Sequence, residues 1–216
     1  MKTKDQFYRR TLPHFHREGY PLFITFRLAN SLPEEVASRL RQEREQEIKS
    51  LPTNLASQRY RVEIKHFYRF DEWLDRCENS PLWLKQTDIA AIVSEKIVSL
   101  AGDRYQLLAY CIMPNHVHLL IRALAVDEPG HQGKTAKYPV ADTLRLLKGS
   151  TARYCNLALQ RNGPFWQHES YDHFVRDEDE LARVIVYILD NPVKAGLVEE
   201  WKDWPFTYVN PGFGDW

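Results

Sequence analysis

The chain has 216 residues, which is enough for one domain with a sizeable buried core. Hydrophobic residues make up 44% and charged residues 27%, a mixture that excludes wholesale disorder. Lys and Arg total 29, as do Asp and Glu, so the formal net charge is zero. This balance argues against a uniformly basic nucleic-acid-coating protein, although a local basic face remains compatible with it.

The cysteine pattern and the hydropathy indicate where the protein works. Cys77, Cys111 and Cys155 are scattered and form no C-x-x-C pair, so we expect a reducing compartment rather than a disulfide framework. The N-terminus lacks the apolar stretch of a signal peptide, and no apolar run approaches the ~18 residues of a membrane helix. We therefore expect one soluble, cytoplasmic domain over 1–216 with no membrane partner.

The first half of the chain predicts one strand and several helices. Residues 1–20 are polar, basic and aromatic, which is typical of a lead-in arm, and 21–28 alternate as a strand does. Ser31 precedes Pro33 and Glu34 as a helix N-cap would, so a helix is expected from there to about residue 49. Helical spacing of apolar residues recurs over 58–78 and 86–101.

The second half predicts a hairpin, two helices and a tail. Residues 105–112 and 116–123 are β-type runs joined by a short turn, and the Gly-, Pro- and Lys-rich segment 125–138 is typical of a mobile surface loop. A helix with basic exposed positions is expected over 140–161. Another is expected from Asp177 to about Asn191, stopped by Pro192. The aromatic tail 201–216 is expected to pack back across the core.

This order of elements favours an α+β fold. We expect an antiparallel, ferredoxin-like βαββαβ sheet with helices on one face and a C-terminal helix that carries a tyrosine. Residues 50–85 then form a helical insertion.

A histidine pair is the sharpest local feature. His116 and His118 are two residues apart on a predicted strand, so both imidazoles project from the same face. Side-by-side imidazoles supply two of the ligands that a divalent cation needs. Two histidines on an ordinary strand would explain the spacing as well. A nucleotide-hydrolase motif with three alternating histidines is disfavoured because position 120 is Leu.

Tyr187 and Asn191 lie one turn apart on the flank of the apolar stripe of the last helix. A phenol and a carboxamide would therefore sit together near the edge of the core. Taken alone, Tyr187 is typical of a core-boundary tyrosine and Asn191 of a helix cap before a proline.

Basic and aromatic residues interleave in several segments, a mixture that suits single-stranded nucleic acid because bases stack on rings and phosphates meet cations. The alternative is a solvated helix face with ordinary core aromatics. The candidate DNA-binding residues are Arg9, Arg10, Arg145, Lys148, Arg153 and Trp166, and Gln167 and His173 are candidates for supporting polar contacts.

Four stretches together resemble the single-tyrosine HUH transposases (IS200-like), in the branch associated with repetitive extragenic palindromes (REP). They are LPHFHREGYPLFITFRLANSLP, YCIMPNHVHLLI, FWQHESYDHFVRDEDEL and YILDNPVKAGLVEEWKDWPF. MPNHVHLL followed by Y-x-x-x-N-P-V-K-A-G is far more specific than either motif alone. The resemblance covers most of the chain and is weakest over 35–100 and 125–138.

The resemblance implies a transposase that cleaves single-stranded DNA. His116, His118 and Asn191 match metal ligands for Mg²⁺ or Mn²⁺, Tyr187 matches the nucleophile that forms a 5′-phosphotyrosine, and His173 matches a supporting position. Some relatives carry Gln where this chain has Asn191. The implied partner is a DNA hairpin of the REP type, the protein would be a monomer or homodimer, and its activity would lie at the bacterial nucleoid.

Two alternatives stay open at this point. A hairpin nucleic-acid-binding module of the same fold would bind with little or no cleavage. A metal-dependent phosphohydrolase would use the histidines and a water, so its turnover would survive Tyr187→Phe, whereas covalent strand transfer would not.

Overall fold

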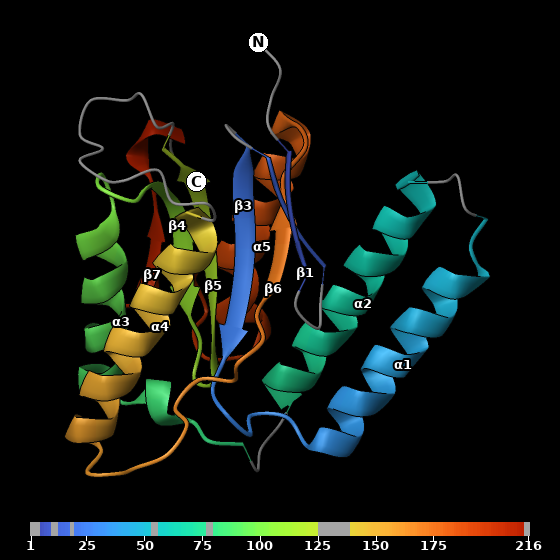
Figure 1. Cartoon of the computed structure of the whole chain (residues 1–216). Helices are drawn as coiled ribbons and strands as arrows, with labels where there is room; N and C mark the ends of the chain where they lie inside the picture. The colour runs from blue at the N-terminus through green and yellow to red at the C-terminus, as the bar shows by residue number, and fades with distance from the viewer. Residues whose placement is uncertain are drawn as a thin grey trace.

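The computed structural model describes residues 5–9, 13–17, 20–52, 56–76, 80–124 and 139–213. The predicted mobile loop 125–138 and the end of the tail therefore lie outside the described residues. The strands are β1 Asp5–Arg9, β2 Pro13–Arg17, β3 Pro21–Arg27, β4 Tyr105–Ile112, β5 His116–Ala123, β6 Tyr171–Phe174 and β7 Thr207–Val209. The α-helices are α1 Glu34–Ser50, α2 Ala56–Arg76, α3 Thr87–Leu100, α4 Pro139–Ala158 and α5 Glu178–Lys194 (Figure 1).

A five-stranded sheet organises the molecule. Its strand order is β6-β3-β5-β4-β7, and every neighbouring pair is antiparallel. The β4–β5 hairpin is the one that the sequence predicts, and the α+β class is confirmed. One residue row crosses all five strands, because Tyr171 pairs with Thr25, Thr25 with His118, His118 with Cys111, and Cys111 with Thr207.

The sheet is covered on both faces. On one face Ile24, Phe26 and Val117 pack with α3 and α4. On the other, Phe23, Leu108 and Leu120 pack with Ile185 and Ile188 of α5 and with Phe67 of α2. The expectation of helices on one face therefore holds for α3 and α4 but is wrong for α5. The physical reason is that residues on both sides of β3, β4 and β5 are buried, so each side needs a cover.

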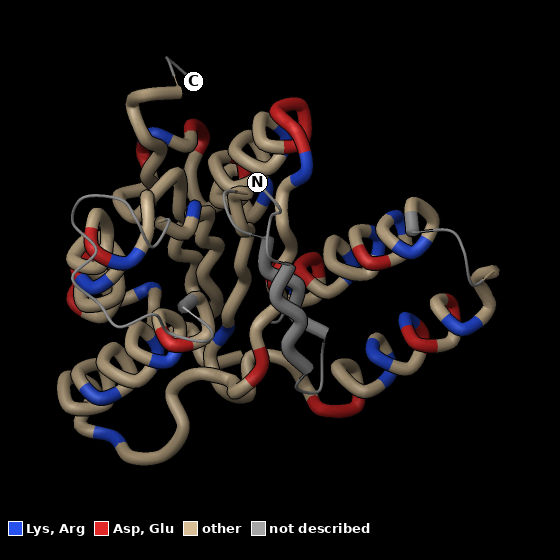
Figure 2. The backbone as a smooth tube through the Cα atoms, turned by 45° about the horizontal axis from the view of Figure 1, so that its top comes forward, with Lys and Arg blue, Asp and Glu red and all other residues tan. Residues whose placement is uncertain are grey.

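Helices α1 and α2 form an antiparallel hairpin beside the sheet (Figure 1). Basic and acidic residues alternate along both helices (Figure 2), and several pair across the hairpin. Glu47 accepts from Lys65 at 2.9 Å and from His66 at 2.8 Å, and Arg69 pairs with Glu43 at 2.9 Å. A small apolar cluster, which includes Ala37, Leu40 and Leu74, packs at the base of this hairpin.

Two predicted helix ends differ from the structure. Ser31 does not cap α1: it is buried, and its hydroxyl accepts from Arg27, while Pro33 occupies the cap position. Helix α5 runs past Pro192 and its last residue is Lys194. Gly196, which follows the C-cap residue Ala195, has a φ of +67°. The N–H groups of Gly196 and Leu197 donate to the carbonyls of Val193 and Pro192, which is the Schellman arrangement. A proline in the last turn removes one donor but does not end the helix, so Asn191 is a helical residue.

The tail returns to the sheet, as predicted, and adds the edge strand β7 beside β4. The N-terminal segment, expected as an arm, instead pairs β1 with β2. None of the helices in the described ranges is long and apolar enough to cross a membrane.

Candidate active site

The two histidines of β5 lie on the α5 side of the sheet and are completely buried. Their Nε2 atoms are 3.0 Å apart, and their rings meet edge to face with centroids 4.7 Å apart. The same-face projection that the sequence predicts is therefore present. His118 is further packed against Phe23, with ring centroids 5.6 Å apart.

Hydrogen bonds behind the rings hold both imidazoles in place. Asn115 donates from Nδ2 to the carbonyl of Leu74 at 2.8 Å and to Ser80 at 3.0 Å, so its Oδ1 is left to accept from Nδ1–H of His116 at 2.7 Å. Nε2 of His116 therefore carries the lone pair of the neutral ring, and it can accept from Nε2–H of His118. Thr25 contacts Nδ1 of His118 at 2.8 Å. Burial lowers the pKa of His116 to about 3, so this ring is neutral at neutral pH.

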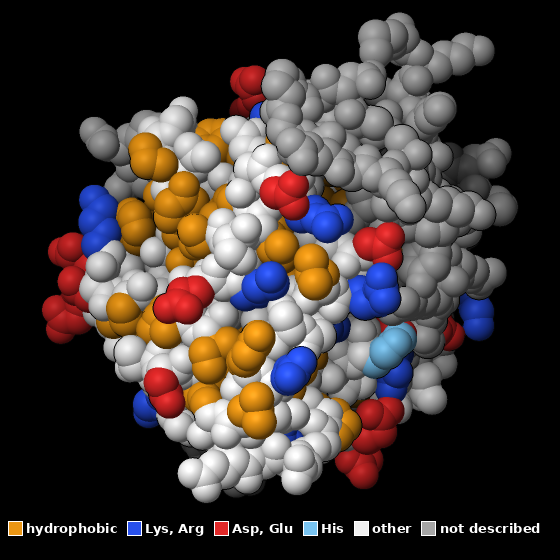
Figure 3. All heavy atoms as spheres, turned by 60° about the vertical axis from the view of Figure 1, so that its left-hand side comes forward, with side chains coloured by type: hydrophobic (Ala, Val, Ile, Leu, Met, Phe, Trp, Pro, Cys, Tyr) orange, Lys and Arg blue, Asp and Glu red, His pale blue; other side chains and the backbone are white. Residues whose placement is uncertain are grey.

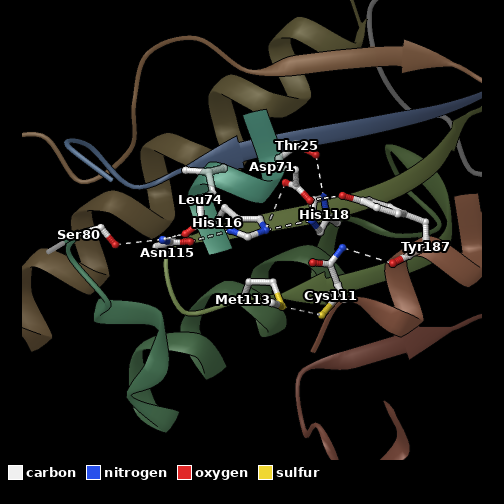
Figure 4. Close-up of polar contacts among 11 residues, drawn as sticks. Thr25, Asp71, Leu74, Ser80, Cys111, Met113, Asn115, His116, His118 and Tyr187 are labelled. Atoms are coloured by element: carbon white, nitrogen blue, oxygen red, sulfur yellow. Dashed lines mark hydrogen bonds and ion pairs between the residues drawn. The ribbon is translucent and has the colours of Figure 1, made fainter. Parts of the chain in front are cut away.

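A carboxylate from α2 completes a group of three potential ligands. Oδ1 of Asp71 is 3.6 Å from Nε2 of His116, and Oδ2 is 3.4 Å from Nε2 of His118. One ligand atom from each of these three buried residues lies within 4.8 Å of the others, a grouping that could hold a metal ion (Figure 4). Burial raises the pKa of Asp71, but the neighbouring histidines and hydrogen-bond donors outweigh it and lower that pKa to about 2.

Tyr187 reaches the same carboxylate from α5. Its hydroxyl donates to Oδ2 of Asp71, and its ring lies 5.5 Å from that of His118 (Figure 4). Burial and the Asp71 charge raise the pKa of this phenol far above its usual value near 10. The ammonium of Lys194 lies 5.2 Å from the ring centroid. The tyrosine and the histidines meet within one chain.

Asn191 lies one turn beyond Tyr187, is buried, and donates from Nδ2 to the Tyr187 carbonyl at 3.3 Å. Its Oδ1 and the Oδ1 of Asp71 are buried without a hydrogen-bond partner among the described residues. Buried oxygens of this kind cost free energy unless something satisfies them. Nε2 of His116 lies 3.6 Å from the Asp71 oxygen. Oxygen and imidazole nitrogen atoms of this kind are ligands of divalent cations, so the residues present fit a metal site.

The site opens through a cleft of about 850 Å³ between α2 and α5. Asp71, Tyr187 and Asn191 line it, and the rim mixes acidic Glu72 and Asp75 with three basic residues, Arg76, Arg183 and Lys194.

The predicted DNA-binding residues are distributed over another face. Arg145 and Arg153 are exposed on α4. Lys148 donates to the carbonyls of Gln167 and His168 and thereby ties α4 to the following loop. Figure 3 shows this face of the molecule, where basic side chains stand singly among hydrophobic and acidic ones. Arg10 and the side chain of Arg9 lie outside the described residues.

Trp166 belongs to the core. It is 7% exposed, its indole N–H donates to Thr151 at 2.9 Å, and its ring packs edge-on to Phe26 and Phe165. The prediction that Trp166 stacks on a base is therefore wrong, because its ring is enclosed.

Of the two supporting residues, Gln167 precedes β6 and His173 lies within it. Gln167 donates its backbone N–H to the carbonyl of Arg27. His173 contacts Glu180 at 3.0 Å, and Glu180 also accepts from the backbone of Arg176. The contact ties His173 of β6 to the first turn of α5, and it thereby helps to fix the helix that carries Tyr187.

Sequence reasoning missed Asp71. The signal lay in the pattern of the helix predicted over 58–78, where Asp71 falls between Phe67 and Leu74 on the buried stripe. A carboxylate on an apolar stripe is rarely buried without a partner. It could therefore have been marked as a candidate, although its partners could not have been named.

Relatives of known family match about half of the chain. It is 34% identical over 103 residues to a putative REP-associated tyrosine transposase of Haemophilus influenzae, and 26% identical over 112 residues to a REP-associated tyrosine transposase of Escherichia coli. The matches cover 48% and 51% of this chain and 58% and 59% of those relatives. The chain thus spans less than two thirds of the length of either relative. No protein-family model matches the sequence.

Among solved structures, a REP-associated tyrosine transposase bound to a REP hairpin aligns with 93% of this chain and 80% of its own at 18% identity and a TM-score of 0.46. A putative transposase from Deinococcus radiodurans aligns with 79% of this chain and 89% of its own at 16% identity and a TM-score of 0.28. Over about half of its length, the chain is thus similar in sequence to REP-associated tyrosine transposases.

Proposed function

We propose that the protein is a metal-dependent endonuclease and strand transferase that acts on single-stranded DNA through a 5′-phosphotyrosine on Tyr187. The observation that carries this proposal is the contact between the Tyr187 hydroxyl and Asp71, at the centre of a buried Asp-His-His group. The sequence similarity to REP-associated tyrosine transposases supports the substrate class. We further propose hairpins of the REP type as the DNA partner.

His116, His118 and Oδ1 of Asp71 would hold a divalent cation, Mg²⁺ or Mn²⁺, with Asn191 as a candidate fourth ligand. When bound, the cation would polarise the scissile phosphate and neutralise charge that develops on it. The mixture of imidazole nitrogen and hard oxygen suits Mn²⁺ better than Mg²⁺, which prefers oxygen alone.

The residues of the chain would supply the nucleophile and the proton acceptor. Tyr187 attacks the phosphorus, the new bond joins its oxygen to the 5′-phosphate, and the 3′-oxygen of the preceding nucleotide leaves. The phenol holds its proton strongly, so it needs an acceptor in contact during attack. Oδ2 of Asp71 is that acceptor. The ammonium of Lys194 beside the ring favours the negative charge that develops on the phenol oxygen.

Strand transfer follows from the retained bond energy. A free 3′-hydroxyl can attack the phosphotyrosine, expel Tyr187 and rejoin a strand, with the proton returning to the phenol. No nucleotide cofactor is needed for this exchange.

Covalent trapping tests the proposal. The protein is incubated with end-labelled single-stranded DNA that contains hairpins, with Mn²⁺ or with EDTA, and the mixture is separated on a denaturing gel. We expect a metal-dependent protein–DNA adduct that Tyr187→Phe abolishes. Tyr68→Phe is the matched control, because Tyr68 lines the same cleft from α2 and is 44% exposed.

Two results would contradict the proposal. Binding without any adduct across many hairpins would favour the binding module. Phosphodiester hydrolysis that survives Tyr187→Phe would favour the phosphohydrolase.

A further inference from the structure

A second cavity, distinct from the cleft at Tyr187, lies between the α1–α2 hairpin and the β3–β6 side of the sheet. Its volume is about 120 Å³. Thr25, Arg27 and Tyr171 line it from the sheet, and Phe67 and Phe70 line it from α2. Three aromatic rings therefore form part of its wall, and charged residues, among them Arg44, Glu63 and Glu169, line the rest. Its size suits one flat ring system rather than a length of strand.

The cavity adjoins the candidate active site. Thr25 lines the cavity and also contacts His118. The ring of Phe67 stacks on Tyr171 at 4.4 Å on one side and lies 5.8 Å from Tyr187 on the other. A single side chain thus separates the cavity from the nucleophile. A nucleotide close to a phosphate at Tyr187 would be within reach of this cavity.

Two buried polar atoms of cavity-lining residues lack a hydrogen-bond partner among the described residues: Nε of Arg44 and Nδ1 of His66. His66 is 5% exposed, and its Nε2 faces the Glu47 carboxylate at 2.8 Å. Nε2 donates to that carboxylate, so Nδ1 is the ring nitrogen that is left without a partner. Arg44 pairs with Glu63 through Nη1 at 3.4 Å, which leaves its Nε–H as a donor.

These features together describe a site for a base. Aromatic side chains suit the face of a heteroaromatic ring, and two buried polar atoms without partners, one of them the Nε–H donor of Arg44, suit its polar edge. An empty cavity that arises from imperfect packing would be lined by apolar groups and would leave no polar group without a hydrogen-bond partner. Arg41, which pairs with Glu34 on α1, also lines the cavity.

We propose that this cavity binds one unpaired nucleotide of the DNA strand, with its base against Phe67, Phe70 and Tyr171 and its edge held by Arg44 and His66. The inference rests on the proposed function, because it takes the ligand to be part of the same substrate. It adds a role for the α1–α2 hairpin, which would then select the strand as well as supply Asp71.

Photocrosslinking locates the base without any need for cleavage. The intact protein is mixed in EDTA with pools of random-sequence single-stranded DNA, each halogenated at one of the four bases, then irradiated and mapped by mass spectrometry. We expect crosslinks at Phe70, Tyr171 or His66 with at least one pool. Crosslinks confined to other residues would overturn the cavity proposal and leave the proposed function standing. If no pool binds, the cavity proposal and the proposed DNA substrate both fail.

A cavity-filling variant gives an independent measurement. Ala37 lines the cavity and is 3% exposed, so Ala37→Leu would occupy part of the space. We expect it to weaken binding of fluorescein-labelled single-stranded DNA about tenfold, as loss of one base stack would. Arg39→Gln, on an exposed position of the same helix, should leave binding unchanged. A packing fault would instead give a higher melting temperature with unaltered affinity, which would overturn the proposal.

Arg44→Met guards against a filling variant that fails to fold. It keeps an unbranched side chain but removes the Nε–H donor and the charge. We expect a several-fold loss of affinity with an unchanged melting temperature. An unchanged affinity in this folded variant would overturn the edge contact.

Discussion

The hydroxyl of Tyr187 donates to Oδ2 of Asp71, while Oδ1 of the same carboxylate faces His116 at 3.6 Å. One carboxylate therefore contacts the candidate nucleophile with one oxygen and the histidine pair with the other. This division allows Asp71 to take the tyrosine proton without leaving the group that could hold a cation. The contact also links α2 and α5, which are far apart in the sequence.

Asp71→Asn should lower the rate of adduct formation about 10²- to 10³-fold, because it removes the proton acceptor and an anionic ligand together. Binding of single-stranded DNA should remain within a few fold. The rate is measured from single-turnover time courses with Mn²⁺. Asp75→Asn is the matched control, one turn along α2 in the same cleft and exposed. Equal effects of the two variants would mean that only the charge of the cleft matters.

Asn115→Ala should weaken Mn²⁺ binding about 10- to 100-fold, because Asn115 fixes the tautomer and orientation of His116. Isothermal titration of the metal without DNA measures this directly. The variant also leaves the Leu74 carbonyl without its donor, so the free energy of unfolding should fall by about 1–3 kcal/mol. Asn156→Ala, on α4 away from the site, should leave the metal affinity unaltered. An unchanged Mn²⁺ affinity in Asn115→Ala would show that Asn115 does not support metal binding by His116.

His173 should make the protein less stable in acid. Burial lowers its pKa to about 4, while the unfolded chain titrates near ~6.5. Between these values the unfolded state binds more protons, so stability is lost as the pH falls through this window, by about 2–3 kcal/mol at pH ~4.5. Urea unfolding between neutral pH and that point should show a smaller loss in His173→Gln than in the parent. His168→Gln, whose histidine is exposed, should follow the parent curve. Superimposed curves for all three proteins would exclude the effect.

Gly196→Ala and Gly149→Ala should change stability in opposite directions. Gly196 adopts a φ of +67°, so a Cβ there should cost about 1–2 kcal/mol even though no atom lies within 4 Å of it. Gly149 lies inside α4, and a Cβ there meets nothing within 4 Å, so alanine should add up to about 1 kcal/mol of helix stability. Urea midpoints give both values. A stabilising Gly196→Ala would mean that α5 does not end in the left-handed conformation.

The sequence predicted what is local. Alternation gave β3 and the β4–β5 hairpin, and the two-residue spacing placed His116 and His118 on one face. Helical periodicity placed Tyr187 one turn from Asn191. It could not reveal that α5 covers the opposite face from α3 and α4, because a buried strand is apolar on both sides whichever helix covers it. The three-residue β7 was too short to give an alternating pattern.

Long-range contacts explain the errors at the site. Asp71 meets the histidines only because α2 folds over the sheet, and no spacing in the sequence encodes that approach. Trp166 was predicted to contact DNA because basic and aromatic residues interleave in the sequence, yet Thr151 on α4 provides a buried acceptor for its indole N–H. The tryptophan therefore joins the core.

The α1–α2 hairpin is held across its length by ion pairs and at its base by a small apolar cluster. Such an element opens at a lower free energy than a sheet buried on both faces. Because Asp71 belongs to α2, partial opening of the α1–α2 hairpin would move the carboxylate away from Tyr187. The site would then be inactive while the sheet stays folded. Salt screens exposed ion pairs, so ionic strength becomes a control on how often the site is assembled. Hydrogen exchange would then report faster opening of α1 and α2 than of β5 as salt increases.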